Sequence, residues 1–103
     1  MVRRAFLMRL KPGALAEYKR RHDEIWPELV EEIKASGIKE FSIFEDDPVL
    51  FLYSEIESED AWDKLWSSDI HHRWAEWFRE LMSIREDGIV DSKIVSEVYR
   101  FES

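Results

Sequence analysis

The stretch from Val49 to Glu57 carries apolar side chains on both faces of a predicted strand. Alternate residues of a strand point to opposite faces of its sheet. One face would hold Leu50, Leu52 and Ile56, and the other would hold Val49, Phe51 and Tyr53. Because both faces of such a strand must be covered, the sheet that contains it needs a packed layer on each side.

Strand-like and helix-like patterns alternate along the chain. Strands are predicted at residues 4–10, 38–45, 49–57 and 93–101, and helical segments at residues 14–36 and from Ser58 to about residue 81. The first helix should break near Glu24–Trp26, because Pro27 lacks a backbone N–H and disfavours helical geometry in the residue before it. The second should restart at Ser67–Asp69. This order, β-α-β-β-α-β, predicts a ferredoxin-like α+β sandwich.

The predicted sheet has two apolar faces, and the helical segments of one chain can cover only one of them. Two helical segments cover one face of a four-stranded sheet, yet the last strand is also apolar on both sides. Its two sets of apolar residues are Ile94 and Val98, opposed to Val95, Tyr99 and Phe101. We therefore expect a second copy of the sheet to cover the other face, which makes the protein a homodimer.

Length and charge narrow the class of protein. The 103 residues suffice for one domain, residues 1–103. The chain has no cysteine, which excludes disulfides, thiolate catalysis and cysteine-bound zinc. A net charge of −8 argues against nucleic acid or an anionic membrane as partner. No apolar run approaches the roughly 20 residues of a membrane span, and residues 1–10 lack a signal-peptide pattern. We expect a cytoplasmic protein.

Two proton-handling side chains interrupt the apolar stripe of the first helix. The stripe consists of Leu15, Tyr18, His22, Ile25 and Leu29. Histidine changes protonation state near neutral pH, and a tyrosine hydroxyl can orient a ligand oxygen. A structural histidine with satisfied hydrogen bonds is the alternative. Aromatic residues elsewhere, including Phe41, Trp74 and Trp77, could wall a pocket for a small ligand such as a sugar, or could simply belong to the core.

A metal site is suggested only by His71, His72 and Asp69. Adjacent helical residues point roughly 100 degrees apart, so two neighbouring histidines do not chelate one ion by themselves. We interpret the pair as a solvated surface and expect no metal. With only three glycines, the chain also shows no phosphate-binding loop, and we expect no cofactor.

The chain resembles the L-rhamnose mutarotase family over nearly its whole length. The most specific segment is His22–Leu29, which reads His-x-x-Ile-Trp-Pro-Glu-Leu. The other segments are Arg3–Met8, Glu17–Tyr18, Glu55–Ser58, Arg73–Trp74 and Ser96–Val98.

The resemblance implies a dimeric ferredoxin-like α/β barrel without cofactor. It implies an isomerase that interconverts the α and β anomers of L-rhamnose or a related 6-deoxy sugar. By matching position, His22 corresponds to the proton donor, and Tyr18 and Trp74 to sugar-binding residues.

Two positions depart from the family pattern. Ala75 stands where family members can carry a second tryptophan, and Phe41 stands where they can carry a tyrosine that contacts the sugar. Trp77, about one turn beyond Trp74, could fill some of the space beside Ala75. We therefore include Phe41 and Trp77 among the expected sugar-binding residues, while the preferred sugar stays open.

Two other functions suit the same residues. Dimeric barrels of this kind also serve as cofactor-free or haem-degrading monooxygenases, which use tryptophan and histidine in an enclosed apolar pocket. A sugar-binding or regulatory module without turnover is the third possibility, and the changes at Phe41 and Ala75 favour it.

Overall fold

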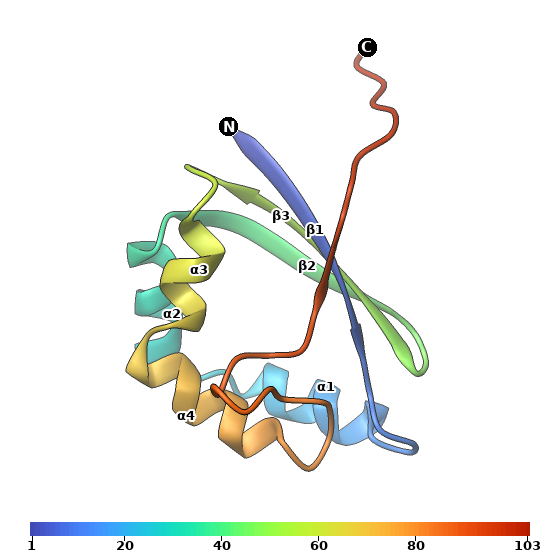
Figure 1. The fold of residues 1–103 in the computed structure, drawn as a ribbon, viewed down its shortest axis with the longest axis vertical. Coiled ribbons are helices and arrows are strands. Elements are labelled where there is room, and N and C mark those ends of the chain that lie inside the picture. Colours follow the sequence, from blue (N-terminus) through green and yellow to red (C-terminus); the bar gives the residue numbers. More distant parts are fainter.

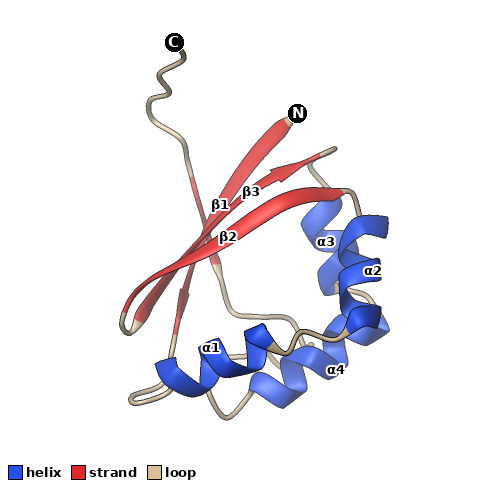
Figure 2. Cartoon of the chain, turned by 180° about the vertical axis from the view of Figure 1, so that it is seen from behind, coloured by secondary structure: helices blue, strands red, loops and turns tan.

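The computed structural model describes residues 1–103 as a four-stranded sheet with four helices on one of its faces (Figures 1 and 2). In chain order the elements are β1 Val2–Arg9, α1 Leu15–Asp23, α2 Pro27–Ala35, β2 Ile38–Asp46, β3 Val49–Ile56, α3 Ala61–Trp66, α4 Asp69–Phe78 and β4 Lys93–Val95. The two predicted helical segments are thus each divided in two.

The strands lie in the order β2-β3-β1-β4, and every neighbouring pair is antiparallel. β1 pairs with β3 along its whole length, so the first strand of the chain becomes an inner strand. This is the ferredoxin-like arrangement, and the predicted fold class is confirmed.

The break in the first helical segment lies where Pro27 predicts it. Trp26 has an extended backbone (ψ 132°) and is the N-cap of α2, whose first residue is Pro27. α1 has already ended at Asp23. Proline suits the first position of a helix because that N–H has no partner there. The break turns the chain so that α1 and α2 follow different directions across the sheet (Figure 2).

The core lies between the helices and the inner face of the sheet. The apolar strand residues buried there are Phe6, Met8, Ile38, Leu50, Leu52 and Ile56. One buried polar group lies among them. Ser54 accepts a hydrogen bond from the indole N–H of Trp62 (2.8 Å) and donates one to the carbonyl of Arg4 (2.8 Å). Because its hydroxyl is fully paired, burying it costs little free energy.

The last strand is shorter than the predicted 93–101. β4 pairs with β1 only at Lys93–Val95, and residues 96–103 form a tail that extends beyond the sheet (Figure 1). An ion pair between Arg3 and Glu97 links the tail to β1. Val98, Tyr99 and Phe101 are all largely exposed. Nothing within one chain covers these side chains, so the prediction of a long strand was wrong for the isolated chain.

The outer face of the sheet is apolar and open, as the strand pattern predicts. Phe51 on β3 pairs with Phe44 of β2 on one side and with Leu7 of β1 on the other. Phe44 and Phe51 are 61% and 44% exposed. Tyr53 and the partly exposed Val95, which both pair with Ala5, add to this apolar sheet face. The covering partner itself stays a prediction.

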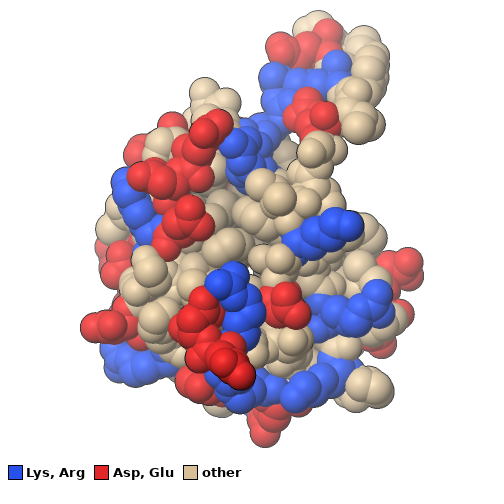
Figure 3. All heavy atoms as spheres, in the orientation of Figure 1, with Lys and Arg blue, Asp and Glu red and all other residues tan.

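Elsewhere the surface is strongly charged. In the view of Figure 3, lysine and arginine side chains alternate with aspartate and glutamate, and the tail carries both signs. The longest helix, α4, has ten residues, about half of what a membrane span requires. None of the helices could cross a bilayer.

Candidate active site

An aromatic cavity lies between the helices and the inner face of the sheet. Its lining includes Tyr18 and His22 of α1, Phe41 of β2, Trp62 and Trp66 of α3, and His71, Trp74, Ala75 and Phe78 of α4. The two histidines are its only lining residues that are not hydrophobic. The cavity of about 60 Å³ has room for about two water molecules. The partly exposed residues of its lining, among them Ile33, Phe41 and Trp66, mark its mouth.

His22 is held by its own helix in a defined tautomer. Its Nδ1 lies 3.1 Å from the backbone carbonyl oxygen of Tyr18, one turn earlier. A carbonyl oxygen only accepts, so Nδ1 carries the proton and Nε2 is the nitrogen free for a ligand. Burial lowers the pKa of His22, while the bond to the Tyr18 carbonyl and the charge of Asp23 oppose that shift. The neutral form therefore has its lone pair on Nε2.

Three rings enclose the imidazole of His22. The ring of Tyr18 lies 4.4 Å from it between centroids, that of Phe78 5.1 Å and that of Trp74 5.4 Å. Burial raises the pKa of the Tyr18 hydroxyl, which keeps it a neutral phenol able to donate or accept a hydrogen bond. A titratable imidazole thus lies against the rings of a tyrosine, a phenylalanine and a tryptophan.

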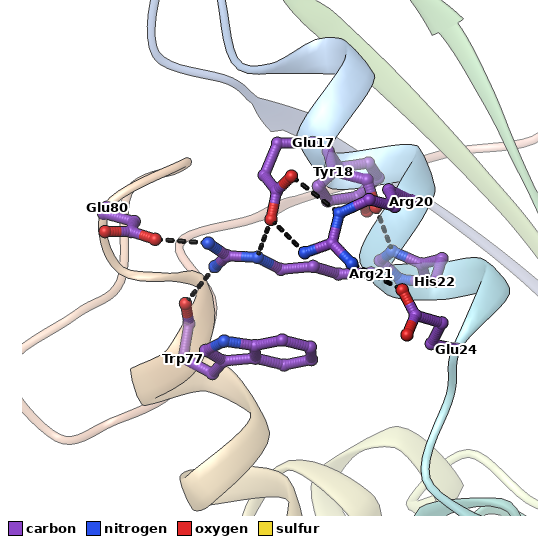
Figure 4. Close-up of polar contacts among 8 residues, drawn as sticks. All are labelled: Glu17, Tyr18, Arg20, Arg21, His22, Glu24, Trp77 and Glu80. Carbon is purple, nitrogen blue, oxygen red and sulfur yellow. Dashed lines mark hydrogen bonds and ion pairs between the residues drawn. The ribbon is translucent and has the colours of Figure 1, made fainter.

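A buried arginine ties α1 to the end of α4 (Figure 4). Arg21 is only 6% exposed. Its Nε donates to Glu17 at 2.7 Å, and its two terminal nitrogens donate to the Trp77 carbonyl and to Glu80. The guanidinium carbon also lies 4.8 Å from the centre of the Trp77 ring. We call these contacts of Arg21 with Glu17, Trp77 and Glu80 the Arg21 clamp. Because Arg21 directly precedes His22, the clamp fixes the distance between His22 and the aromatic residues of α4.

Comparison with known proteins identifies the family of this chain. Residues 3–101 match the sequence model of a family described as L-rhamnose mutarotase. The chain belongs to the L-rhamnose mutarotase family. It is 42% identical to the L-rhamnose mutarotase of Tolumonas auensis over 101 residues, 96% of this chain and 97% of that protein. It is 36% identical to that of Clostridium beijerinckii over 104 residues, 99% of this chain and all of the relative.

Solved structures agree with this membership. The crystal structure of an L-rhamnose mutarotase from Formosa agariphila superposes with a TM-score of 0.87 at 32% identity, covering 99% of this chain and 100% of that one. A dimeric ferredoxin-like protein from an uncultured marine organism superposes with a TM-score of 0.62 at 14% identity, covering 98% of this chain and 97% of that one. The second likeness concerns the fold alone.

Four of the five predicted site residues line the same cavity. Tyr18, His22, Trp74 and Phe41 come from three different elements and meet there. Phe41 lies at the mouth, 5.5 Å from the ring of Trp62. Trp77 does not line the cavity. Its ring stacks on Trp26 at 5.6 Å and lies under Arg21.

The structure thus corrects the expectation that Trp77 fills the space beside Ala75. Trp77 lies two residues after Ala75, so the two side chains leave the helix in different directions. Ala75 is completely buried and itself lines the cavity.

His71 corrects a second expectation, that the His71–His72 pair is a solvated surface. His71 is 6% exposed and lines the cavity, whereas His72 is partly exposed and does not line it. The sequence contained the signal: His71 lies three residues before Trp74 and seven before Phe78, which places it on their stripe. No three histidine, aspartate or glutamate side chains lie close enough to hold a metal ion.

Proposed function

We propose that this protein interconverts the α and β anomers of L-rhamnose, or of a related 6-deoxy sugar, with His22 as the acid–base group. The observation that carries the proposal is the state of His22. Its Nδ1 is bound to the backbone, which leaves Nε2 free in a cavity lined by aromatic rings. Family membership supports the substrate, since the relatives are named L-rhamnose mutarotases.

The reaction needs only proton transfers. The bond between the anomeric carbon and the ring oxygen breaks while the ring oxygen gains a proton and the anomeric hydroxyl loses one. The free aldehyde turns by half a rotation, and the ring closes with the opposite configuration. One general acid–base group contributes typically about 10²–10⁴-fold in rate, so a site with few polar groups suffices.

Each residue has a distinct role in this proposal. His22, whose neutral form has its lone pair on Nε2, first takes up a proton there from solvent, donates it to the ring oxygen and recovers it on closure. Tyr18, held as a phenol, hydrogen-bonds a sugar oxygen, and a water that enters with the sugar accepts the anomeric proton. Trp74 and Phe41 pack against the C–H faces and the methyl group of the sugar. The residues at the mouth move to admit the sugar into the small cavity.

Saturation-transfer NMR on L-rhamnose tests the role of His22. The His22→Ala protein should lose at least about 100-fold in anomer exchange, because its acid–base group is gone. His72→Ala, a histidine that does not line the cavity, is the matched control and should keep the native rate. Native exchange in His22→Ala would refute the proposal. Sugar binding without exchange in the native protein would instead identify a sugar-binding module.

A comparison of two sugars tests the apolar environment of the 6-methyl group. L-mannose differs from L-rhamnose only by a hydroxyl on carbon 6. A hydroxyl buried against aromatic rings without a partner costs about 1–3 kcal/mol. The kcat/KM for L-mannose should therefore be about tenfold or more below that for L-rhamnose. Equal values would place the methyl group in solvent.

A further inference from the structure

A second histidine lines the cavity without a role in the mechanism above. His71 lies on α4, and its Nδ1 is buried and has no hydrogen-bond partner. Most buried polar side-chain atoms in proteins are paired, and an unpaired one costs about 1–3 kcal/mol. A leucine at this position would avoid that cost. The unpaired nitrogen is therefore a feature that the fold does not explain.

The surroundings of His71 leave its side chain open to the cavity. Ala75 lies four residues later on the same helical face, where a larger side chain would cover the imidazole. Burial, with smaller effects of His72 and His22, lowers the pKa of His71 to about 4. It is therefore neutral at pH 7. A neutral imidazole offers one N–H donor and one lone pair, which matches a sugar hydroxyl.

The other lining residues supply few polar atoms for a sugar. The indole N–H of Trp62 is already bound to Ser54. Phe41 has no hydroxyl. The indoles of Trp66 and Trp74 also line the cavity, but an indole N–H only donates. A sugar with several hydroxyl groups needs more partners, acceptors above all, than Tyr18, His22 and these indoles provide, because each unpaired buried hydroxyl weakens binding.

We propose that His71 binds a ring hydroxyl of the sugar and thereby determines which arrangement of hydroxyls the site accepts. The inference rests on the proposed function for the identity of the ligand. His71 acts here on recognition, while proton transfer stays with His22. Because residue 75 is an alanine, the side chain one turn after His71 is small enough to leave the imidazole accessible to that hydroxyl.

Sugars that lack one hydroxyl test this role. L-rhamnose and its 2-deoxy, 3-deoxy and 4-deoxy forms are compared by NMR anomer exchange, using the native protein, His71→Leu and His71→Asn. The native protein should lose about tenfold or more in kcat/KM for one of the three deoxy sugars. In His71→Leu, the ratio of kcat/KM between L-rhamnose and that deoxy sugar should fall by the same factor, because the variant has a higher KM for L-rhamnose. His71→Asn, which keeps a donor and an acceptor, should restore part of the preference.

The outcomes separate this inference from the proposed function. Native exchange with identical selectivity in all three proteins would overturn the role of His71 and leave the proposed function standing. Absence of exchange in the native protein would overturn both. Thermal unfolding checks that the variants fold, and His71→Leu should be at least as stable as the native protein because it removes an unpaired buried group. Comparing ratios between variants cancels the differences in intrinsic reactivity among the sugars.

Discussion

At the scale of single residues, two histidines in one cavity differ in how the chain holds them. His22 has its Nδ1 fixed by the carbonyl of Tyr18, which determines its tautomer. His71 has no such bond at Nδ1. Burial lowers the pKa of both. The burial that lowers both pKa values also makes the folded state resist protonation.

Stability should therefore fall as the pH decreases from about 6.5 to 4. In this range the unfolded chain binds a proton at residue 71, while the folded chain, with a pKa of about 4 there, does not. The free energy of unfolding is therefore highest above pH 6.5, where residue 71 is neutral in both states. By pH 4 it has fallen by about 3 kcal/mol. Urea unfolding of native protein and His71→Leu across this range measures the effect. Parallel curves for the two proteins would contradict it, since the carboxylates titrate in both.

At the scale of elements, the position of α1 against α4 determines the site. α1 carries Tyr18 and His22, and α4 carries His71 and Trp74. Two contacts connect these helices beyond the cavity. One is the clamp formed by Arg21. The other is Trp26, the N-cap of α2, whose ring centroid lies 5.1 Å from that of Trp74 and 5.6 Å from that of Trp77. The break at Pro27 therefore places a tryptophan where it braces α4.

Replacing Arg21 by lysine should loosen this connection. Lysine lacks the planar fork that reaches Glu17, the Trp77 carbonyl and Glu80 together. We expect Arg21→Lys to lose about 1–2 kcal/mol of unfolding free energy in urea, with lower kcat for anomer exchange. Arg20→Lys is the matched control. Arg20 also pairs with Glu17 but its side chain is 54% exposed, so the change should stay within about 0.5 kcal/mol. Equal losses of unfolding free energy in the two variants would show that the buried position of Arg21 does not contribute to stability.

At the scale of the whole molecule, one face of the sheet is covered and the other is open. The helices bury the inner face, while Phe44, Phe51 and Tyr53 remain exposed on the outer one. A contiguous apolar face of this kind is typical of an interface between subunits. The tail with its exposed Val98, Tyr99 and Phe101 offers further apolar surface. The predicted homodimer would bury this surface.

Sedimentation velocity at micromolar concentration tests the dimer. The native protein should sediment as a dimer. Phe51→Glu should sediment as a monomer, because Phe51 lies between Phe44 and Leu7 on inner strand β3 and a buried, unpaired carboxylate there is costly. Lys64→Glu, on an exposed part of α3, should leave the dimer intact. A native monomer at this concentration would refute the prediction.

Local patterns predicted most of the fold and several residues that the structure brings together in the cavity. The alternation in Val49–Ile56 and the stop at Pro27 depend on neighbouring residues, so strand faces and the helix break were correct. Tyr18 and His22 were found because they interrupt an apolar stripe within one helix. His71 was misread, because a short run of histidines on a charged chain looks like surface until the stripe of Trp74 is extended back to it.

By itself the sequence determined the order of strands and helical segments, because periodicity and turn residues act over a few positions, and the resemblance of its segments indicated the family. Only the tertiary structure decided that Trp77 braces Trp26, that Arg21 is buried and that His71 reaches the cavity. Those outcomes depend on how α4 packs against α1, α2 and the sheet, and packing between segments distant in sequence leaves no signature in the local pattern of any one of them.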